Sequence, residues 1–257
     1  MSKVNKYNMI TWDDDGTPST SCASEYSYPI IEGDVINFYI NFFANMALDA
    51  SGWEIGWWTP GSVFIEDITT LNVDSIDGIN SNVYGSVTVG VLPRSLLRLV
   101  IYDPDNYDEI KYWSNPFKFV TSTSGTSVLK YRNARSVLNY EFENITTFYN
   151  QVRINVRIGE PIVASDVTGY MTSAGRKVRS RSLHTVTREF ETQFFDEYAH
   201  QGFEAATQMS AIYFDSVRYE RAIDAQYTQQ TVPKDYSFWL GRLRLEQYDF
   251  TAVAANT

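Results

Sequence analysis

The sequence contains very few of the residue types on which metal and nucleophilic sites depend. Its 257 residues include one cysteine, Cys22, and two histidines, His184 and His200. So few sulfur and imidazole ligands argue against a structural zinc site. A single cysteine cannot form a disulfide within the chain. Cys22 lies in a polar stretch with neither histidine near it, which favours an incidental thiol over a nucleophile.

Motifs of catalytic and nucleotide-binding sites are also missing. There is no His-Glu-x-x-His, phosphate-binding Walker loop, dinucleotide-binding glycine fingerprint, nucleophile elbow or paired-cysteine spacing. Among 31 acidic residues, nothing selects the carboxylate pair that a glycoside hydrolase needs. We therefore expect a protein that is not an enzyme and that binds no metal or cofactor. An unrecognised hydrolase is kept as an alternative, ranked after the two functions introduced below.

Long apolar runs are absent too. A membrane-spanning helix needs about 18 consecutive apolar residues, and the richest stretch, Leu96–Tyr102, is interrupted by Arg98. Two lysines near the N-terminus are not followed by an apolar segment, so no secretion signal is visible. Apolar residues nevertheless make up 44% of the chain, which is typical of a folded protein. We expect a protein without a membrane span that works where it is made or leaves by lysis.

The charge of the chain is unevenly distributed. Residues 1–120 contain 6 Lys/Arg and 16 Asp/Glu, whereas residues 121–257 contain 15 of each, so the formal net charge of −10 belongs to the first half. This acidity argues against a general nucleic-acid-binding protein, which needs a positive face. It suits a surface that lets nucleic acid slide past or one that meets a basic partner.

Short strands fill the first half of the chain. Strict alternation after Gly33 predicts a half-buried strand with Ile36, Phe38, Ile40 and Phe42 on one face. Further strands are expected at Trp53–Trp58, Ser62–Ile68, Tyr84–Leu92 (with Val87, Val89 and Val91 on one face), Leu96–Tyr102 and Ile110–Trp113. Turn residues separate these segments. The pattern predicts an immunoglobulin-like β-sandwich.

The second half is predicted to be an α+β domain, an antiparallel sheet with one helix. Strands are expected at Val128–Tyr131, Leu138–Phe142, Val152–Ile158, Arg176–Phe190, Ile212–Glu220 and Phe238–Tyr248. The helix follows Asp196, a good N-cap, and apolar or small residues recur at helical spacing: Tyr198, Ala199, Gly202, Ala206 and Met209.

A polar run between the two halves predicts a domain boundary. The chain as a whole is therefore expected to be mainly β. Its expected parts are an N-terminal arm (1–25), a β-sandwich domain (26–120), a linker (121–127), an α+β domain (128–250) and a C-terminal tail (251–257).

Clustered tryptophans are one candidate binding feature. Trp53, Ile55 and Trp57 fall on one strand face, which favours burial, so Trp58 is expected to point outward. Exposed aromatic rings can stack on sugars. This gives an alternative function, a carbohydrate- or receptor-binding β-sandwich module.

A basic strand is the other candidate. It contains Arg176, Lys177, Arg179 and Arg181, and strand alternation predicts the last three on one face. Three cations within about 14 Å of strand need anions opposite them or open water. An acidic protein neighbour fits better than nucleic acid, because the second half is neutral overall and the first half is acidic. Lys177, Arg179, Arg181 and Trp58 are the hypothesised subunit-interface residues.

Several short segments, taken in order, resemble tail ring or adaptor (connector) proteins of crAss-like and related Bacteroidetes phages. These segments are Gly33–Ile36, Tyr112–Phe117 (Tyr-Trp-Ser-Asn-Pro-Phe), Lys130–Asn133 (Lys-Tyr-Arg-Asn), Tyr140–Phe142, Val152–Ile158 and the helix from Asp196 to His200. The resemblance covers about residues 30–250. It transfers no functional residue, because the family motif contains none that is catalytic.

The resemblance implies a virion protein that is made in the host cytoplasm and forms a homo-oligomeric ring in the tail. Its expected partners are copies of itself, the portal and other tail proteins. DNA would pass through without specific binding. In a closed ring each subunit meets its neighbours through two different patches. The acidic first half and the basic strand are candidates for these patches.

Overall fold

The computed structural model describes residues 3–4, 8–13, 25–42, 54–60, 64–70, 72–75, 81–132, 148–222, 224–230 and 237–248. Over these residues the protein is mainly β. It has a curled half-barrel sheet, a closed six-stranded antiparallel β-barrel and one short helix. The prediction of a mainly β chain with one helix in its second half is confirmed.

The half-barrel sheet is built almost entirely from the first half of the chain. Its strands are β1 (Lys3–Val4), β2 (Trp12–Asp13), β3 (Tyr28–Ile30), β5 (Glu54–Trp58), β6 (Phe64–Thr70), β9 (Leu96–Asp103), β10 (Asn106–Ser114) and β11 (Phe117–Phe119). Strand β9 is central and pairs antiparallel with β5, β10 and β11, while β3 pairs parallel with β11.

The barrel is built from the second half. Its strands are β12 (Thr126–Arg132), β13 (Asn150–Ile158), β15 (Lys177–Phe195), β16 (Ala211–Phe214), β17 (Val217–Arg221) and β19 (Trp239–Gln247). It closes because β13 pairs with both β12 and β15. The helix α1 (Glu197–Thr207) joins β15 to β16 and packs against β12 and β15. Asp196 caps it by accepting a hydrogen bond from the Ala199 amide at 2.7 Å, as predicted.

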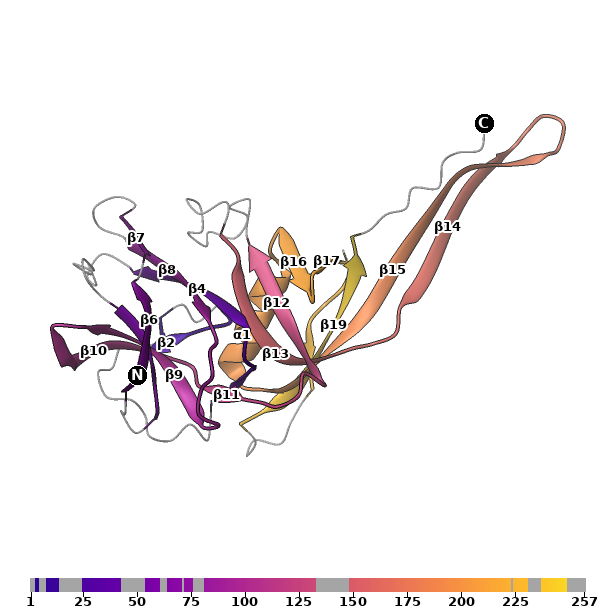
Figure 1. Ribbon diagram of the computed structural model, residues 1–257. Helices are drawn as coiled ribbons and strands as arrows, with labels where there is room; N and C mark the ends of the chain where they lie inside the picture. The colour runs from indigo at the N-terminus through magenta and orange to yellow at the C-terminus, as the bar shows by residue number, and fades with distance from the viewer. Residues whose placement is uncertain are drawn as a thin grey trace.

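Five further strands complete the sheets. A layer formed by β4 (Val35–Phe42), β7 (Asn72–Ser75) and β8 (Ser81–Thr88) joins the barrel through one pairing between β4 and β13. Strand β18 (Thr228–Gln229) pairs with β19, and β14 (Ile162–Met171) pairs with β15. Figure 1 shows β14 and β15 projecting from the barrel as a long hairpin.

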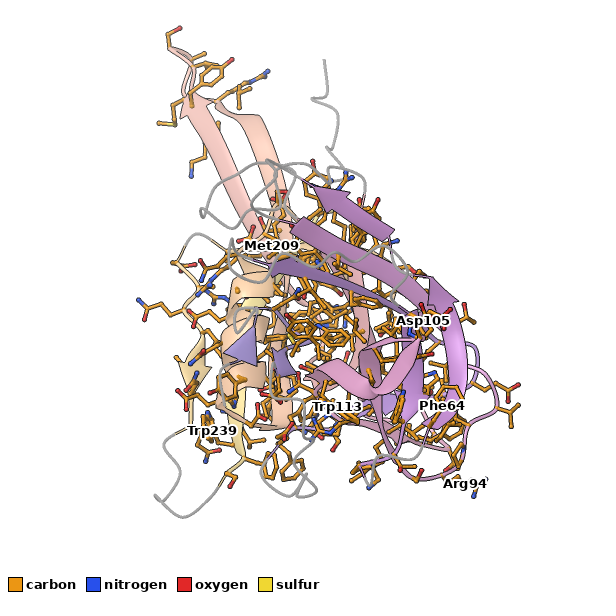
Figure 2. The ribbon with its side chains drawn as sticks, turned by 90° about the vertical axis from the view of Figure 1, so that its left-hand side faces the viewer. Phe64, Arg94, Asp105, Trp113, Met209 and Trp239 are labelled. Carbon is orange, nitrogen blue, oxygen red and sulfur yellow. The ribbon has the colours of Figure 1, made fainter. Side chains whose placement is uncertain are left out.

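One hydrophobic core extends through the half-barrel, the β4 layer and the barrel. The rings of Trp12 and Phe38 lie 5.4 Å apart and join β2 to β4. The rings of Tyr26 and Phe195 lie 4.5 Å apart and join the first half of the chain to the barrel. Figure 2 shows this mass of packed side chains in the middle of the molecule.

Several local predictions need correction. Met9, Ile10 and Trp12, assigned to an N-terminal arm, are buried in the core, because β2 pairs with β10. Val91, predicted to share a strand face with Val87 and Val89, is 83% exposed, whereas Val87 and Val89 are buried; β8 ends at Thr88, so Val91 lies beyond the strand.

Other predictions concern breaks between elements. The segment Ile212–Glu220 is two strands with a tight turn at Asp215 and Ser216, both of positive φ. Strand β12 begins at Thr126, inside the predicted linker 121–127. The expected strand Leu138–Phe142 and Cys22 lie outside the described residues. The domain boundaries stay a prediction.

Candidate functional site

The hairpin of β14 and β15 is the main candidate functional site. Its two strands and the turn between them are called the arm below; this arm is distinct from the predicted N-terminal arm (1–25). Its register runs from Ile162 opposite Thr187 to Met171 opposite Lys177. Pairing of β15 with β19 begins only at Thr187. Residues 177–186 of β15 therefore pair with β14 alone. At about 3.3 Å per residue, this two-stranded part extends about 30 Å from the barrel.

The tip of the arm is a tight, hydrogen-bonded turn. The Thr172 amide donates to the Arg176 carbonyl at 2.9 Å, and the Gly175 amide donates to the Thr172 carbonyl at 2.9 Å. Gly175 has φ of 75°, a conformation that glycine adopts without strain. The Thr172 hydroxyl also accepts a hydrogen bond from the Arg176 amide at 3.1 Å. These bonds hold the end of the arm in one shape.

Strand β14 exposes large apolar side chains to solvent. Ile162, Val163, Tyr170 and Met171 are 59%, 62%, 59% and 66% exposed, respectively. Among the described residues, β14 pairs with no strand other than β15, so its outer edge presents unpaired backbone groups. An exposed edge with apolar side chains is a template for pairing with another chain. The arm has the surface chemistry of an interface.

The predicted basic residues lie at the tip of the arm. Arg176 is in the turn and Lys177 begins β15, and both side chains are exposed. Thr168 and Gly169 are consecutive on β14, yet they pair with Arg181 and Arg179, which are two residues apart. This irregularity interrupts the alternation on which the shared face of Lys177, Arg179 and Arg181 was predicted. The side chains of Arg179 and Arg181 lie outside the described part of the structure, so their interface role stays a prediction.

Trp58 is not at the surface. Trp57 and Trp58 do point to opposite faces of the sheet, but Trp58 is only 5% exposed. It packs in a second cluster, 5.8 Å from the Tyr102 ring and 5.9 Å from the Trp113 ring. The expectation of an outward Trp58 is therefore wrong. Alternation predicts the sheet face to which a side chain points, but not whether that face is covered. Here side chains from neighbouring strands cover it.

Phe64 is the aromatic residue of this cluster that reaches solvent. Its ring lies 5.6 Å from the Trp58 ring and is 38% exposed. Figure 2 places Phe64 and Trp113 at the half-barrel end of the molecule, away from the arm. A single partly exposed ring offers a sugar little area for stacking.

A second group of functional side chains surrounds His200 on α1. His200 is fully buried, and its ring stacks on Trp239 with centroids 5.0 Å apart. The Trp239 carbonyl lies 3.2 Å from Nε2, so Nε2 carries the proton and Nδ1 accepts from the Tyr227 hydroxyl. Burial lowers the pKa of His200 to about 4 and raises the pKa of Tyr227. The imidazole is therefore neutral at pH 7 and enclosed, which suits a structural role.

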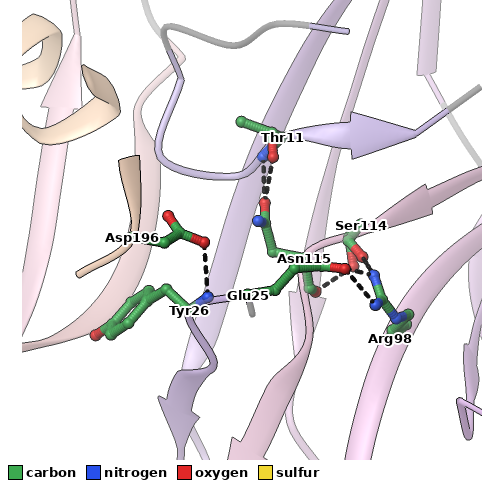
Figure 3. Close-up of polar contacts among 7 residues, drawn as sticks. All are labelled: Thr11, Glu25, Tyr26, Arg98, Ser114, Asn115 and Asp196. Atoms are coloured by element: carbon green, nitrogen blue, oxygen red, sulfur yellow. Dashed lines mark hydrogen bonds and ion pairs between the residues drawn. The ribbon is translucent and has the colours of Figure 1, made fainter. Parts of the chain in front are cut away.

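A third polar group fixes the first half of the chain to the barrel (Figure 3). Buried Arg98 donates to Glu25 at 3.0 and 3.2 Å and to the Ser114 carbonyl at 2.6 Å. The side chain of Asp196 accepts from the Tyr26 amide at 2.7 Å with the oxygen that does not cap α1. One carboxylate thus fixes both the start of the helix and the strand that leads into β3.

Asn115 fixes the N-terminal segment in the same region. Its Oδ1 accepts hydrogen bonds from the Thr11 amide and hydroxyl, both at 2.7 Å (Figure 3). These groups bind one another and buried backbone. We interpret the polar cluster as structural.

Among the described residues, no group of three or more His, Cys, Asp or Glu side chains could hold a metal ion. A depression of about 230 Å³ is lined by Thr228, Gln229, Gln230, Leu240 and Arg242. It is smaller than the roughly 300–1,000 Å³ of most ligand pockets, and Arg242 is its one charged residue. No helix in the described ranges has the length and apolar character required to cross a bilayer.

Sequence comparisons add no relative. No model of a known protein family matches the chain, and no curated protein matches it.

The arm shows what sequence reasoning missed. Strand β14 was not predicted, because Ile162 and Val163 are adjacent apolar residues that are both exposed, so the segment does not alternate. A weaker signal was available: a Thr-Ser-Ala-Gly turn between two runs rich in valine and threonine is typical of a hairpin.

Proposed function

We propose that the chain is a structural virion protein. It is a subunit of an oligomeric ring in a phage tail or connector, between the portal and the distal tail, and it has no catalytic role. The arm is the observation that carries this proposal. It combines a hairpin about 30 Å long, an outer edge without a described partner strand and four exposed apolar side chains.

Stability considerations favour a covered arm. A two-stranded ribbon on its own is at best marginally stable in water. Exposed sheet edges invite association unless they are short, charged or covered. The arm is neither short nor uniformly charged, and its exposed apolar groups lie along the open strand. In an assembly where a neighbouring subunit covers β14, the two-stranded ribbon gains support and its apolar edge is no longer exposed.

The charge distribution supports a ring that DNA traverses. The first half carries the entire net charge of −10. Acidic walls bind DNA phosphates poorly, so a channel lined by such a surface lets a genome pass without specific binding. The resemblance of short segments to phage tail ring and adaptor proteins points to the same class of protein.

Two finer features belong to this proposal. The half-barrel sheet and the β4 layer are interpreted as a variant of an immunoglobulin-like sandwich, supported by the packing of Trp12 on Phe38 between them. Function as a carbohydrate-binding module loses its main support, because that alternative depended on an exposed Trp58.

The test is to look for the chain in particles. Virus particles from the source of the gene are purified, and their proteins are identified by mass spectrometry. Cryo-electron microscopy then locates density that fits the barrel and the arm. A ring of this fold between the capsid portal and the distal tail is the expected result. Particles that lack the chain, or that contain it only as a dispersed monomer, would refute the proposal.

A further inference from the structure

The tip of the arm is strongly basic. Residues 167–182, from Val167 to its register partner Ser182, contain four cations, Arg176, Lys177, Arg179 and Arg181, and no Asp or Glu; the acid next to this part is Asp166. Arg176 and Lys177 are exposed, and Met171, opposite Lys177 in the register, is 66% exposed. The tip therefore offers positive charge beside an apolar side chain, which is a combination that binds an acidic protein surface.

The acidity of the rest of the molecule does not cancel this charge. About 30 Å of ribbon separates the tip from the barrel. The Debye length is about 8 Å at physiological ionic strength, so charges on the body are screened at that distance. A partner that approaches the tip encounters a local positive field, although the whole chain carries a net charge of −10.

The opposite end of the molecule carries the matching negative charge. Residues 99–110 include four acids, Asp103, Asp105, Asp108 and Glu109, and no Lys or Arg. They surround the turn between β9 and β10, which closes with Asn106 opposite Asp103, and Asp105 is exposed. Figure 1 shows this hairpin and the arm at opposite ends of the ribbon, and Figure 2 shows Asp105 far from the arm.

We propose that the arm of one copy docks on the turn between β9 and β10 of a second copy. This inference rests on the proposed function and specifies how its subunits meet. The sequence of one patch contains four cations and that of the other contains four acids. Two arms facing each other would bring like charges together, which disfavours a symmetric arm-to-arm dimer.

The proposed contact also explains a ring. The two patches differ and lie at opposite ends of the folded molecule (Figure 1), so the contact is heterologous, and repeated heterologous contacts form a ring when the rotation closes. Exposed ion pairs are individually weak and cannot hold a ring alone. Burial of Tyr170 and Met171 supplies affinity, while the charges select the register and speed the encounter.

Nucleic acid is the competing partner for a basic ribbon. Contacts to phosphates require cations alone, whereas the arm also exposes Ile162, Val163, Tyr170 and Met171. The observations therefore favour a protein surface. Binding to DNA is included below as an outcome that would overturn the inference.

The first experiment removes the net charge of each patch separately in the full-length chain. The arm variant, Arg176→Glu with Lys177→Glu, leaves two cations beside two new acids, and the turn variant, Asp105→Lys with Asp108→Lys, leaves two acids beside two new cations. Mass photometry measures the protein concentration at half-assembly. Each variant is expected to need about 30-fold more protein than wild type at about 0.1 M salt, and the difference is expected to shrink at about 1 M salt. Circular dichroism and the melting temperature verify that each variant folds.

The matched control changes charge equally at another place. Arg94→Glu with Lys118→Glu alters the net charge as much as the arm variant does, and both side chains are exposed. Figure 2 shows Arg94 at the end of the molecule opposite the arm. This control is expected to assemble like wild type. An equal loss of assembly in the control would attribute the effect to net charge and overturn the inference.

Mixing the two variants provides the decisive test. Alone, each variant places like charges opposite each other at the two substituted positions of every contact. In an equimolar mixture, the two new acids on the arm of one variant meet the two new lysines on the turn of the other, and the remaining contacts join an unchanged arm to an unchanged turn. The mixture is expected to recover wild-type assembly with alternating subunits. Failure of the mixture to recover, with both variants folded, would refute the contact.

Cross-linking locates the partner directly. A photoreactive residue at Met171, in a mixture of unlabelled and ¹⁵N-labelled chains, is expected to cross-link to residues 99–110 of another copy. Cross-links between two arms, or no cross-links in wild-type chains, would refute the inference. Arm variants that assemble normally but lose binding to a DNA duplex would also refute it. Rings that form independently of the arm would refute the docking contact but not the proposed function. Virus particles that lack the chain would refute the proposed function.

Discussion

Replacing Gly241 by alanine should disrupt the buried polar group around His200 and Tyr227. A Cβ atom at Gly241 would lie 2.5 Å from Cζ of Tyr227 and closer still to its hydroxyl oxygen. That hydroxyl donates to Nδ1 of His200 and lies 3.3 Å from the Thr192 hydroxyl. The ring of Tyr227 must therefore move, and both hydrogen bonds are lost.

The size of the effect follows from these contacts. Forcing an extra carbon into a packed site costs about 1–3 kcal/mol. Each lost hydrogen bond adds about 1 kcal/mol. We expect Gly241→Ala to lower the free energy of unfolding by about 3–5 kcal/mol. With a urea dependence of about 2–3 kcal/mol per molar, the unfolding midpoint should fall by more than about 1 M.

A double-mutant cycle tests the cause. In a Tyr227→Ala background the new methyl group has space, so Gly241→Ala should cost at least about 2 kcal/mol less than in wild type. Gly159→Ala is the matched control. Its Cβ would be 3.2 Å from the Glu189 carbonyl oxygen, a distance that a small shift relieves, so its cost should stay below about 1 kcal/mol. Additive effects of the two substitutions would refute this explanation.

Three further predictions concern the buried polar groups. The pKa of His200 is near 6.5 in the unfolded chain and about 4 in the folded protein, so the free energy of unfolding should fall by about 3 kcal/mol as the pH drops through this range. Urea unfolding at several pH values should show a weaker pH dependence of stability in His200→Gln than in wild type. The same pH dependence in both proteins would contradict the assignment. Arg98→Met should lower the free energy of unfolding by about 3–5 kcal/mol, because the Glu25 carboxylate loses its guanidinium partner. Adding Glu25→Met should recover most of that loss. A double variant as unstable as the single one would show that the unpaired carboxylate is not the cause. Asp196→Ala should cost about 2–4 kcal/mol in thermal or urea unfolding, because the α1 cap and the bond to the Tyr26 amide are both lost, with Asp196→Asn intermediate.

Local patterns predicted most individual elements. The strands predicted from short apolar or alternating segments match β4, β9, β12 and β13 within a few residues, and Asp196 followed by apolar residues at helical spacing located α1. These signals work because period and capping are properties of neighbouring residues. They also predicted the face of Trp58 correctly.

Long-range arrangement was not predictable by the same means. The exposure of Trp58 depends on Tyr102 and Trp113, which are more than forty residues away in sequence. The burial of Trp12 depends on the pairing of β2 with β10. For the candidate site, the sequence identified the basic residues of the arm but not β14, because an exposed strand lacks the alternation that a core imposes.

The N-terminal segment has a consequence for the order of folding. A Cβ atom at Gly202 would lie 2.5 Å from the Asn8 carbonyl oxygen, so the helix and the start of the chain meet backbone to backbone across almost two hundred residues. The side chain of Asn8 also donates to the Tyr39 carbonyl at 3.1 Å. Residues synthesised first therefore reach their final positions only after α1 has left the ribosome. Contacts so distant in sequence slow folding, and a nascent chain that ends at residue 120 lacks the surface on which its own beginning must pack.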